Sequence, residues 1–192
     1  MVERITLLGG CGKSGQREPV ARVDLNMGQV VSIVGPTGSG KTTLFNDIEL
    51  FADGSTPTKR RVLINDRPPG PEYRDDPSRN PIALITQHTN FLSDLPVREF
   101  LAIHAEIRRS DDDAAEAVVG RTLAFANQLT GEAVLQHYRM TELSGGQTRA
   151  LLIADAVIIG NAPIVLLDEI ENAGIHRMRA LELLRRYRKI FV

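Results

Sequence analysis

The chain has 192 residues, with 23 basic and 24 acidic side chains and a formal net charge of −1. This length suffices for one α/β domain with a hydrophobic core. The balanced charge excludes a general attraction to nucleic acid or to an anionic membrane. The single cysteine, Cys11, excludes an internal disulfide. The most apolar stretch, 150–167, contains Asp155, Asn161 and Pro163, so it is predicted to form a buried helix and a buried strand rather than a membrane span.

The N-terminal segment has the pattern of a β-region. Short apolar runs at Ile5–Leu8, Val20–Leu25 and Val30–Val34 are separated by glycine-containing turns. Gly10–Ser14 imitates a phosphate-binding loop, but Leu7 stands where the first glycine of such a loop belongs. We therefore predict a hairpin turn there.

A glycine-rich segment follows the third of these runs and leads into a predicted helix. Its pattern, Gly-x-x-x-x-Gly-Lys-Thr between a strand and a helix, is typical of loops that bind nucleotide phosphates. We expect Lys41 to reach the β- and γ-phosphates and the Thr42 hydroxyl to bind Mg²⁺. An ordinary glycine-rich turn is the alternative, which the Lys-Thr pair in register disfavours. The predicted nucleotide-binding residues are Gly35, Pro36, Thr37, Gly38, Ser39, Gly40, Lys41, Thr42 and Thr43.

The middle of the chain changes from strand to helix character. Strands are predicted at Val62–Ile64 and at Ile82–Ile85, the second of which runs into Thr86-Gln87. From about residue 97 the apolar residues take helical spacing, so an inserted helical segment is predicted over 97–140. The acidic run Ser110–Asp113 is interpreted as a helix start rather than a metal site.

The C-terminal part again alternates between helix and strand. The segment Leu143–Gln147 precedes an apolar helix at Thr148–Ile159. A strand at Ile164–Leu167 then runs into Asp168-Glu169. A last helix is predicted at Arg177–Arg188, and Lys189–Val192 begins another strand.

Four signals in this order resemble the nucleotide-binding domain of an ATP-binding cassette (ABC) ATPase. They are the phosphate loop, Gln87 at a strand end, Leu-Ser-Gly-Gly-Gln at 143–147, and the apolar strand ending in Asp168-Glu169. The resemblance covers the chain from about residue 18 onward. It implies an α/β fold with a P-loop NTPase core, a mainly parallel sheet, an N-terminal antiparallel β-region and an inserted helical subdomain. The core would comprise 1–96 and 141–192, and the helical subdomain 97–140.

The resemblance also implies roles for the site residues. Asp168 would face Mg²⁺ together with Thr42 and Gln87. Glu169 would be the general base that polarises the attacking water. The alternative is that the Asp168 and Glu169 carboxylates are simply a solvated strand end. Gln87 and Lys41 would assist catalysis. A signature loop would bind the γ-phosphate held by a second subunit. Two ATP molecules would then lie between two head-to-tail chains. The alternative is that this loop is a plain helix cap. The signature residues are Leu143, Ser144, Gly145, Gly146 and Gln147.

The sequence departs from the family in three places. No aromatic residue precedes Phe45 to stack on adenine, and Arg17 is more simply a surface residue than a substitute. The segment Ile170–His176 lacks the expected aspartate. The switch histidine of the family lies just beyond the strand at which the chain stops, so we expect a truncated chain that binds nucleotide and hydrolyses it slowly. No histidine stands at that place; the four are His88, His104, His137 and His176.

The leading functional interpretation is the ATPase subunit of an ABC transporter, converting ATP and water to ADP and phosphate. Its expected partners are a second copy or a paralogous ABC subunit and a transmembrane permease, which would hold it at the cytoplasmic face of the membrane. One alternative is a soluble ABC ATPase acting on a protein, a metalloenzyme or a nucleoprotein, and another is a regulatory module without turnover. No nucleic-acid partner is expected, because the basic clusters Lys59–Arg61 and Arg185–Lys189 are interpreted as solvated faces.

Overall fold

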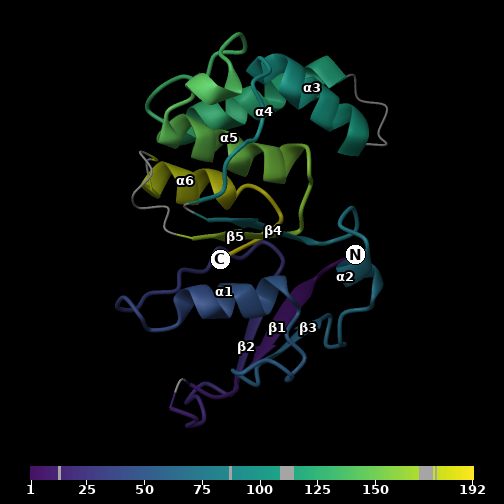
Figure 1. Cartoon of the computed structure of the whole chain (residues 1–192), viewed down its shortest axis with the longest axis vertical. Helices are drawn as coiled ribbons and strands as arrows, with labels where there is room; N and C mark the ends of the chain where they lie inside the picture. Colours follow the sequence, from purple (N-terminus) through teal and green to yellow (C-terminus); the bar gives the residue numbers. More distant parts are fainter. Residues whose placement is uncertain (13, 87, 109–114, 169–174, 176) are drawn as a thin grey trace.

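The structure is a computed structural model that describes residues 1–12, 14–86, 88–108, 115–168, 175 and 177–192. A parallel sheet lies in the middle of the molecule (Figure 1). The helices α3, α4, α5 and α6 cover one side of this sheet, and α1 with an antiparallel sheet covers the other. The α/β class, the parallel core and the N-terminal antiparallel β-region agree with the expectation from the sequence.

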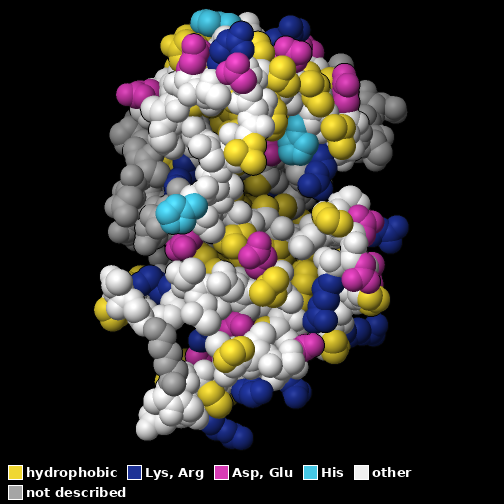
Figure 2. Space-filling view, viewed as in Figure 1, with side chains coloured by type: hydrophobic (Ala, Val, Ile, Leu, Met, Phe, Trp, Pro, Cys, Tyr) yellow, Lys and Arg dark blue, Asp and Glu magenta, His cyan; other side chains and the backbone are white. Residues whose placement is uncertain are grey.

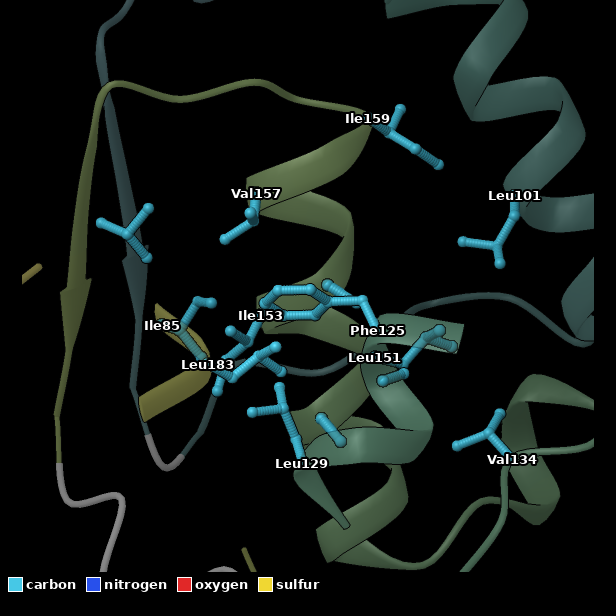
Figure 3. Packing of buried hydrophobic residues seen from close by; sticks show 14 of the residues in the cluster. Ile85, Leu101, Phe125, Leu129, Val134, Leu151, Ile153, Val157, Ile159 and Leu183 are labelled. Carbon is cyan, nitrogen blue, oxygen red and sulfur yellow. The ribbon is translucent and has the colours of Figure 1, made fainter. Parts of the chain in front are cut away.

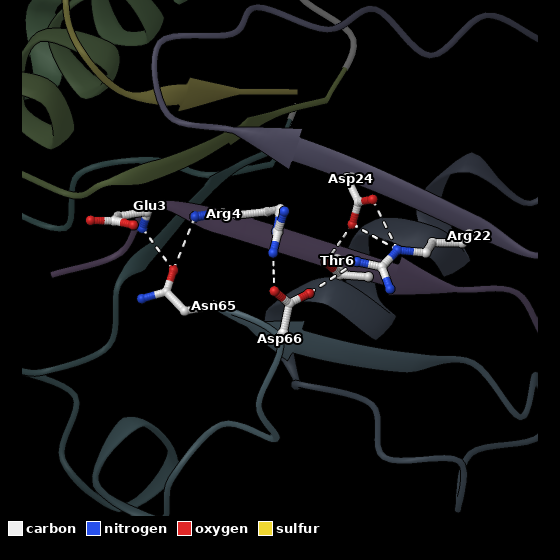
Figure 4. A network of polar contacts seen from close by, with 7 residues as sticks. All are labelled: Glu3, Arg4, Thr6, Arg22, Asp24, Asn65 and Asp66. Atoms are coloured by element: carbon white, nitrogen blue, oxygen red, sulfur yellow. Dashed lines mark hydrogen bonds and ion pairs between the residues drawn. The ribbon is translucent and has the colours of Figure 1, made fainter.

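The antiparallel sheet consists of β1 (Arg4–Leu8), β2 (Arg22–Asn26) and β3 (Arg61–Ile64), in the order β2-β1-β3. One face of it packs apolar side chains against α1. The other face carries a polar network in which Arg22 binds Asp24 and Asp66 at 2.9 Å each (Figure 4). This division into an apolar and a polar face is typical of an antiparallel sheet with one solvated side.

The parallel sheet consists of β4 (Ile82–Ile85), β5 (Ile164–Leu167) and β6 (Ile190–Phe191), in the order β4-β5-β6. All of β5 is buried. Ile164 and Leu166 join the core around α1, whereas Val165 and Leu167 join the core of the helical layer. A strand with both faces covered needs a continuous apolar run, which is why this segment is easily recognised in the sequence.

The helices are α1 (Lys41–Glu49), α2 (Glu72–Asp75), α3 (Val97–Arg108), α4 (Ala115–Leu129), the 3₁₀ turn η1 (Met140–Glu142), α5 (Gly145–Ile158) and α6 (Arg177–Leu184). The inserted segment shares one hydrophobic core with α5, in which Leu101, Phe125 and Leu151 are almost completely buried (Figure 3). Within the described ranges no helix is long and apolar enough to cross a bilayer.

Two sequence predictions were wrong in their extent. The expected strand Val30–Val34 pairs with β6 only around Val30, which lies opposite Phe191, and the Val34 side chain is 87% exposed. A ladder needs a neighbouring backbone, and no strand in the described part of the chain pairs with residues 32–34. The last helix ends at Leu184 rather than Arg188 because the chain must turn to place Lys189 at the start of β6.

Candidate functional site

The phosphate loop connects the Val30 bridge to α1. Gly38 and Gly40 have φ angles of 81° and 91°, in the left-handed region that favours glycine. Gly40 is the N-cap of α1, and no side chain caps this helix. Because the first N–H groups of a helix have no partner within it, this end presents donors to an anion.

Lys41 is bonded to its own loop. Its amine donates hydrogen bonds to the carbonyl oxygens of Gly35 at 2.6 Å and Pro36 at 3.1 Å. The loop around it, from Pro36 to Ser39, is exposed. The ammonium group is therefore held over the loop by two carbonyl oxygens, where an incoming anion can reach it.

A partly buried ionic cluster fixes the rear of α1. Arg60 donates to Asp47 on α1 at 2.9 Å and to both carboxylate oxygens of Glu18 at 3.1 Å. Thr58 also donates to Asp47, at 2.9 Å. Hydrogen bonding to Glu18 raises the pKa of Arg60, and the same bond lowers the pKa of Glu18. The interpretation of Arg60 as part of a solvated face was wrong: its side chain is only 14% exposed.

The cluster also holds the hairpin that follows β1. The backbone N–H of Gly10 donates to Glu18 at 3.0 Å, and Cys11 bridges Arg17 in antiparallel fashion. The prediction of a hairpin turn in this segment is thus confirmed. Arg17 is exposed at the end of the turn.

The predicted carboxylate Asp168 lies at the edge of the parallel sheet where β5 ends. Its side chain is half-buried, and its backbone N–H donates to the carbonyl oxygen of Ile85 at 2.9 Å. Ile85 pairs with Leu167, so β4 and β5 end side by side. The guanidinium of Arg149 on α5 donates to the carbonyl oxygen of Asp168 at 3.2 Å. This sheet edge is where ligands bind in open α/β folds.

Some predicted site residues lie outside the described residues. They are Gln87 and Glu169. The expected helix start at 110–113 and most of the segment 170–176 also lie outside the described residues. Among the residues that the structure does describe, no group of three or more His, Cys, Asp or Glu side chains is placed to hold a metal. Of the three predicted Mg²⁺ ligands, Thr42 and Asp168 lie within the described residues; Thr42 is exposed and Asp168 is half-buried.

The signature loop opens α5 with a reciprocal cap. Ser144 is the N-cap, and its hydroxyl accepts a hydrogen bond from the backbone N–H of Gln147 at 3.3 Å. The Gln147 side chain accepts in return from the Ser144 N–H at 2.9 Å. Ser144 and Gly145 are exposed, and a side chain at Gly145 would meet nothing within 4 Å. The cap is therefore complete while the space in front of it is open.

A hollow of about 230 Å³ lies between the start of α5 and the segment after β4. The face drawn in Figure 2 is also indented elsewhere, at its right edge, between the helical layer and the rest of the molecule. The hollow has residues 88–90 on one side and the start of α5 on the other, a proximity that the separate motifs do not reveal. Its lining residues are His88, Thr89, Asn90, Leu143, Gly145, Thr148 and Arg149.

These features define an α/β nucleotide-binding protein of the P-loop type. A profile of the ABC transporter family matches residues 20–172. The uncharacterized ABC transporter ATP-binding protein MJ0121 of Methanocaldococcus jannaschii is 48% identical over 189 residues, which are 98% of this chain and 71% of that protein. The thiamine import ATP-binding protein ThiQ of Chelativorans sp. is 33% identical over 73% of this chain, which spans about half (53%) of ThiQ.

Solved structures agree in fold. CbiO1 of Clostridium perfringens, part of the ABC transporter complex CbiONQ, superposes with a TM-score of 0.71 at 21% identity, over 100% of this chain and 77% of that one. The ATP-binding cassette MJ0796, in a dimeric post-hydrolysis state with ADP and Pi, superposes with a TM-score of 0.67 at 24% identity. The match covers 98% of this chain and 86% of that one. The chain belongs to the ABC transporter family of ATP-binding proteins, which hydrolyse ATP.

Proposed function

We propose that this chain binds ATP with Mg²⁺ at Gly35–Thr43 and hydrolyses it within a head-to-tail dimer that drives a separate transmembrane permease. The observation that carries the proposal is the start of α1, a glycine-rich loop without a side-chain cap into which Lys41 is folded. Such an end offers N–H donors and a cation to the phosphates. On binding, phosphate oxygens replace the carbonyls of Gly35 and Pro36 as partners of the Lys41 amine.

The chemistry then falls to the edge of the parallel sheet. Thr42 and Asp168 would hold Mg²⁺ through hard oxygen ligands of the kind that this ion prefers. The bound ion would supply positive charge against the charge that develops on the phosphates. Glu169 takes a proton from the water while the water oxygen bonds to the γ-phosphorus and the bond from that phosphorus to the β–γ bridging oxygen breaks, so that ADP leaves; Gln87 orients the water. The proposed role of Asp168 as a Mg²⁺ ligand is supported by its position where β5 ends, with its backbone N–H bonded to the carbonyl oxygen of Ile85.

The dimer part of the proposal concerns the residues Leu143–Gln147. Their helix start is exposed and rigidly capped, so it can meet the γ-phosphate held by a second chain. The structural relative MJ0796 is described as a dimer with ADP and Pi. A permease partner is supported by apolar side chains in and before α3 that face solvent: Leu92 is 100%, Ile107 75% and Ile103 43% exposed.

The first test is nucleotide binding by Lys41→Met. Losing the charged donor should weaken the binding of a fluorescent ATP analogue about 100-fold, on the scale of roughly 3 kcal/mol for charge-assisted hydrogen bonds. Lys59→Met is the matched control, because Lys59 is exposed and outside the loop. Equal affinities of the two variants would contradict the assignment of the phosphate site.

The permease is tested separately. We expect purification of the full-length protein from its native cells in mild detergent to recover a polytopic membrane protein in matching amount, identified by mass spectrometry. Recovery of a soluble enzyme or a ribonucleoprotein alone would contradict the transport role and leave the ATPase assignment intact.

A further inference from the structure

A short loop after α4, residues 130–134, lies against the signature loop and is firmly anchored. The flanking side chains of Leu129 and Val134 are buried, with exposed fractions of 0% and 2%. Asn127 exchanges two hydrogen bonds with the backbone of Val134, at 2.7 and 3.2 Å. Thr130 also forms an antiparallel bridge with Ile175. We call residues 130–134 the signature brace.

The signature brace makes two contacts with the start of α5. The side-chain amide of Gln147 donates to the carbonyl oxygen of Ala133 at 2.9 Å. The Ser144 hydroxyl donates to a carboxylate oxygen of Glu132 at 3.2 Å. The backbone N–H of Glu132 is itself bonded to the Thr130 hydroxyl at 3.2 Å. The backbone that carries Glu132 is thus anchored next to the signature serine, while the Glu132 and Ser144 side chains are both exposed.

This contact uses the one proton that Ser144 can donate. A serine hydroxyl has a single O–H donor, and Glu132 is its acceptor. A γ-phosphate that approaches the start of α5 needs the same donor. Within the described residues no ion pair joins Glu132 to a basic side chain. Its carboxylate lies within hydrogen-bond reach of the Ser144 hydroxyl, which the phosphate is expected to approach.

We propose that Glu132 is a positioning residue that orients the Ser144 hydroxyl and, through its charge, opposes entry of the nucleotide phosphate carried by a second chain. This inference rests on the proposed head-to-tail dimer. It adds an electrostatic barrier to closure of that dimer, which we call the Glu132 brake. The signature loop stays ordered without nucleotide, and ATP must displace an anion before the dimer closes. The relevant phosphate chemistry is that of a nucleoside triphosphate bound to another copy of this chain.

The test separates the effect of the Glu132 charge from that of its hydrogen-bonding side chain. Glu132→Gln retains a hydrogen-bond acceptor but removes the charge, and Glu132→Ala removes both. Dimerisation of the full chain is measured by sedimentation velocity with ATPγS and Mg²⁺, at low and high salt. Two unit charges at contact distance in water correspond to about a fivefold effect per site, and the dimer contains one such contact at each of its sites. Both variants should therefore lower the dimer Kd at least fivefold, and less so in 0.5 M salt because exposed charges are screened.

The matched control is Glu106→Gln, which makes the same charge change at an exposed position on α3 and should leave the dimer Kd unaltered. If the parent chain is monomeric with ATPγS and only the Glu132 variants dimerise, the brake is supported. If the parent dimerises and the Glu132 variants match it, or dimerise more weakly, the inference about Glu132 is wrong and the dimer stands. If all of them bind ATPγS but stay monomeric, the head-to-tail dimer is wrong and the brake falls with it.

Discussion

The starts of α1 and α5 differ in how their first backbone N–H groups find hydrogen-bond partners. Both helices begin at or just after glycines, and both are proposed to face phosphate. At α5 the Ser144 and Gln147 side chains satisfy each other's backbone N–H groups. At α1 no side chain caps the helix, and Lys41 folds back on the loop carbonyls.

The difference teaches how an open binding loop is kept in place. Because the start of α1 is left for a ligand, its position is fixed from behind, through the contacts of Asp47 with Arg60 and Thr58. The α5 helix is fixed at its own ends: the cap and the signature brace hold its start, and Lys189 donates to the carbonyl oxygen of Ala162 just past its end. The α1 helix is anchored by an ion pair and a hydrogen bond behind its start, whereas α5 is anchored by hydrogen bonds at its two ends.

Breaking the anchor of α1 should have the largest effect on stability. Arg60→Met leaves Asp47 and Glu18 without their cation, and removing one partner of a largely buried pair costs about 3 kcal/mol. Arg61→Met is the control, since Arg61 is exposed on β3 and its loss should cost less than about 0.5 kcal/mol. Urea denaturation of both variants measures this. Similar midpoints would mean that the cluster does not support α1.

The far end of α5 should respond to pH. Burial lowers the pKa of Lys189 from 10.5 to about 8. Between these values the unfolded chain holds a proton that the folded chain has lost, so the free energy of unfolding rises with pH through this window. We expect a gain of about 2 kcal/mol between pH 7.5 and 9.5, since one pKa unit corresponds to about 1.4 kcal/mol.

The control for this prediction is Lys189→Gln, whose amide can still donate to Asn161 and Ala162 but does not titrate. Urea titrations of both proteins at the two pH values give the difference directly. If the rise with pH persists in Lys189→Gln, another group is responsible.

The smallest effect should come from the two helix starts themselves. Ser144→Ala removes the cap of α5 and should cost about 1 kcal/mol. Thr42→Ala, in the uncapped first turn of α1, should change the stability by less than about 0.5 kcal/mol while it weakens Mg²⁺-dependent ATP binding. Thermal unfolding without nucleotide and ATP binding with and without Mg²⁺ separate the two outcomes. If Ser144→Ala and Thr42→Ala lost the same stability, the claim that α5 is capped by a side chain and α1 is not would be contradicted.

Local patterns were enough to predict part of this molecule. The phosphate loop, the helix after Leu143–Gln147 and the continuous apolar strand Ile164–Leu167 are each encoded within a few residues, and the structure contains the expected turn, helix and strand. The helix begins at Gly145 rather than Thr148, because the Ser144 cap adds a turn in front of the apolar run. The strand expected at Val30–Val34 was predicted too long because its extent depends on a pairing partner supplied by β6.

Contacts between distant segments could not be predicted in the same way. Arg60 looked like one member of a basic surface run, and only the fold brings Glu18 and Asp47 to it. Glu132 carries no motif at all, and its contact with Ser144 arises from the packing of α4 against α5. Sequence spacing defines which residues share an element, whereas these contacts depend on how elements meet.

The pairing of β4 with β5 has a consequence for how the chain acquires its structure. Ile82 pairs with Ile164, so about 80 residues of chain must fold between the two strands or be closed into a loop before they meet. The contacts of α3, α4 and α5 are more local and can form early. We therefore expect the helical layer to assemble first and to bring the edges of the nucleotide site together in a later, slower step, so that competence to bind ATP is among the last properties to appear during refolding.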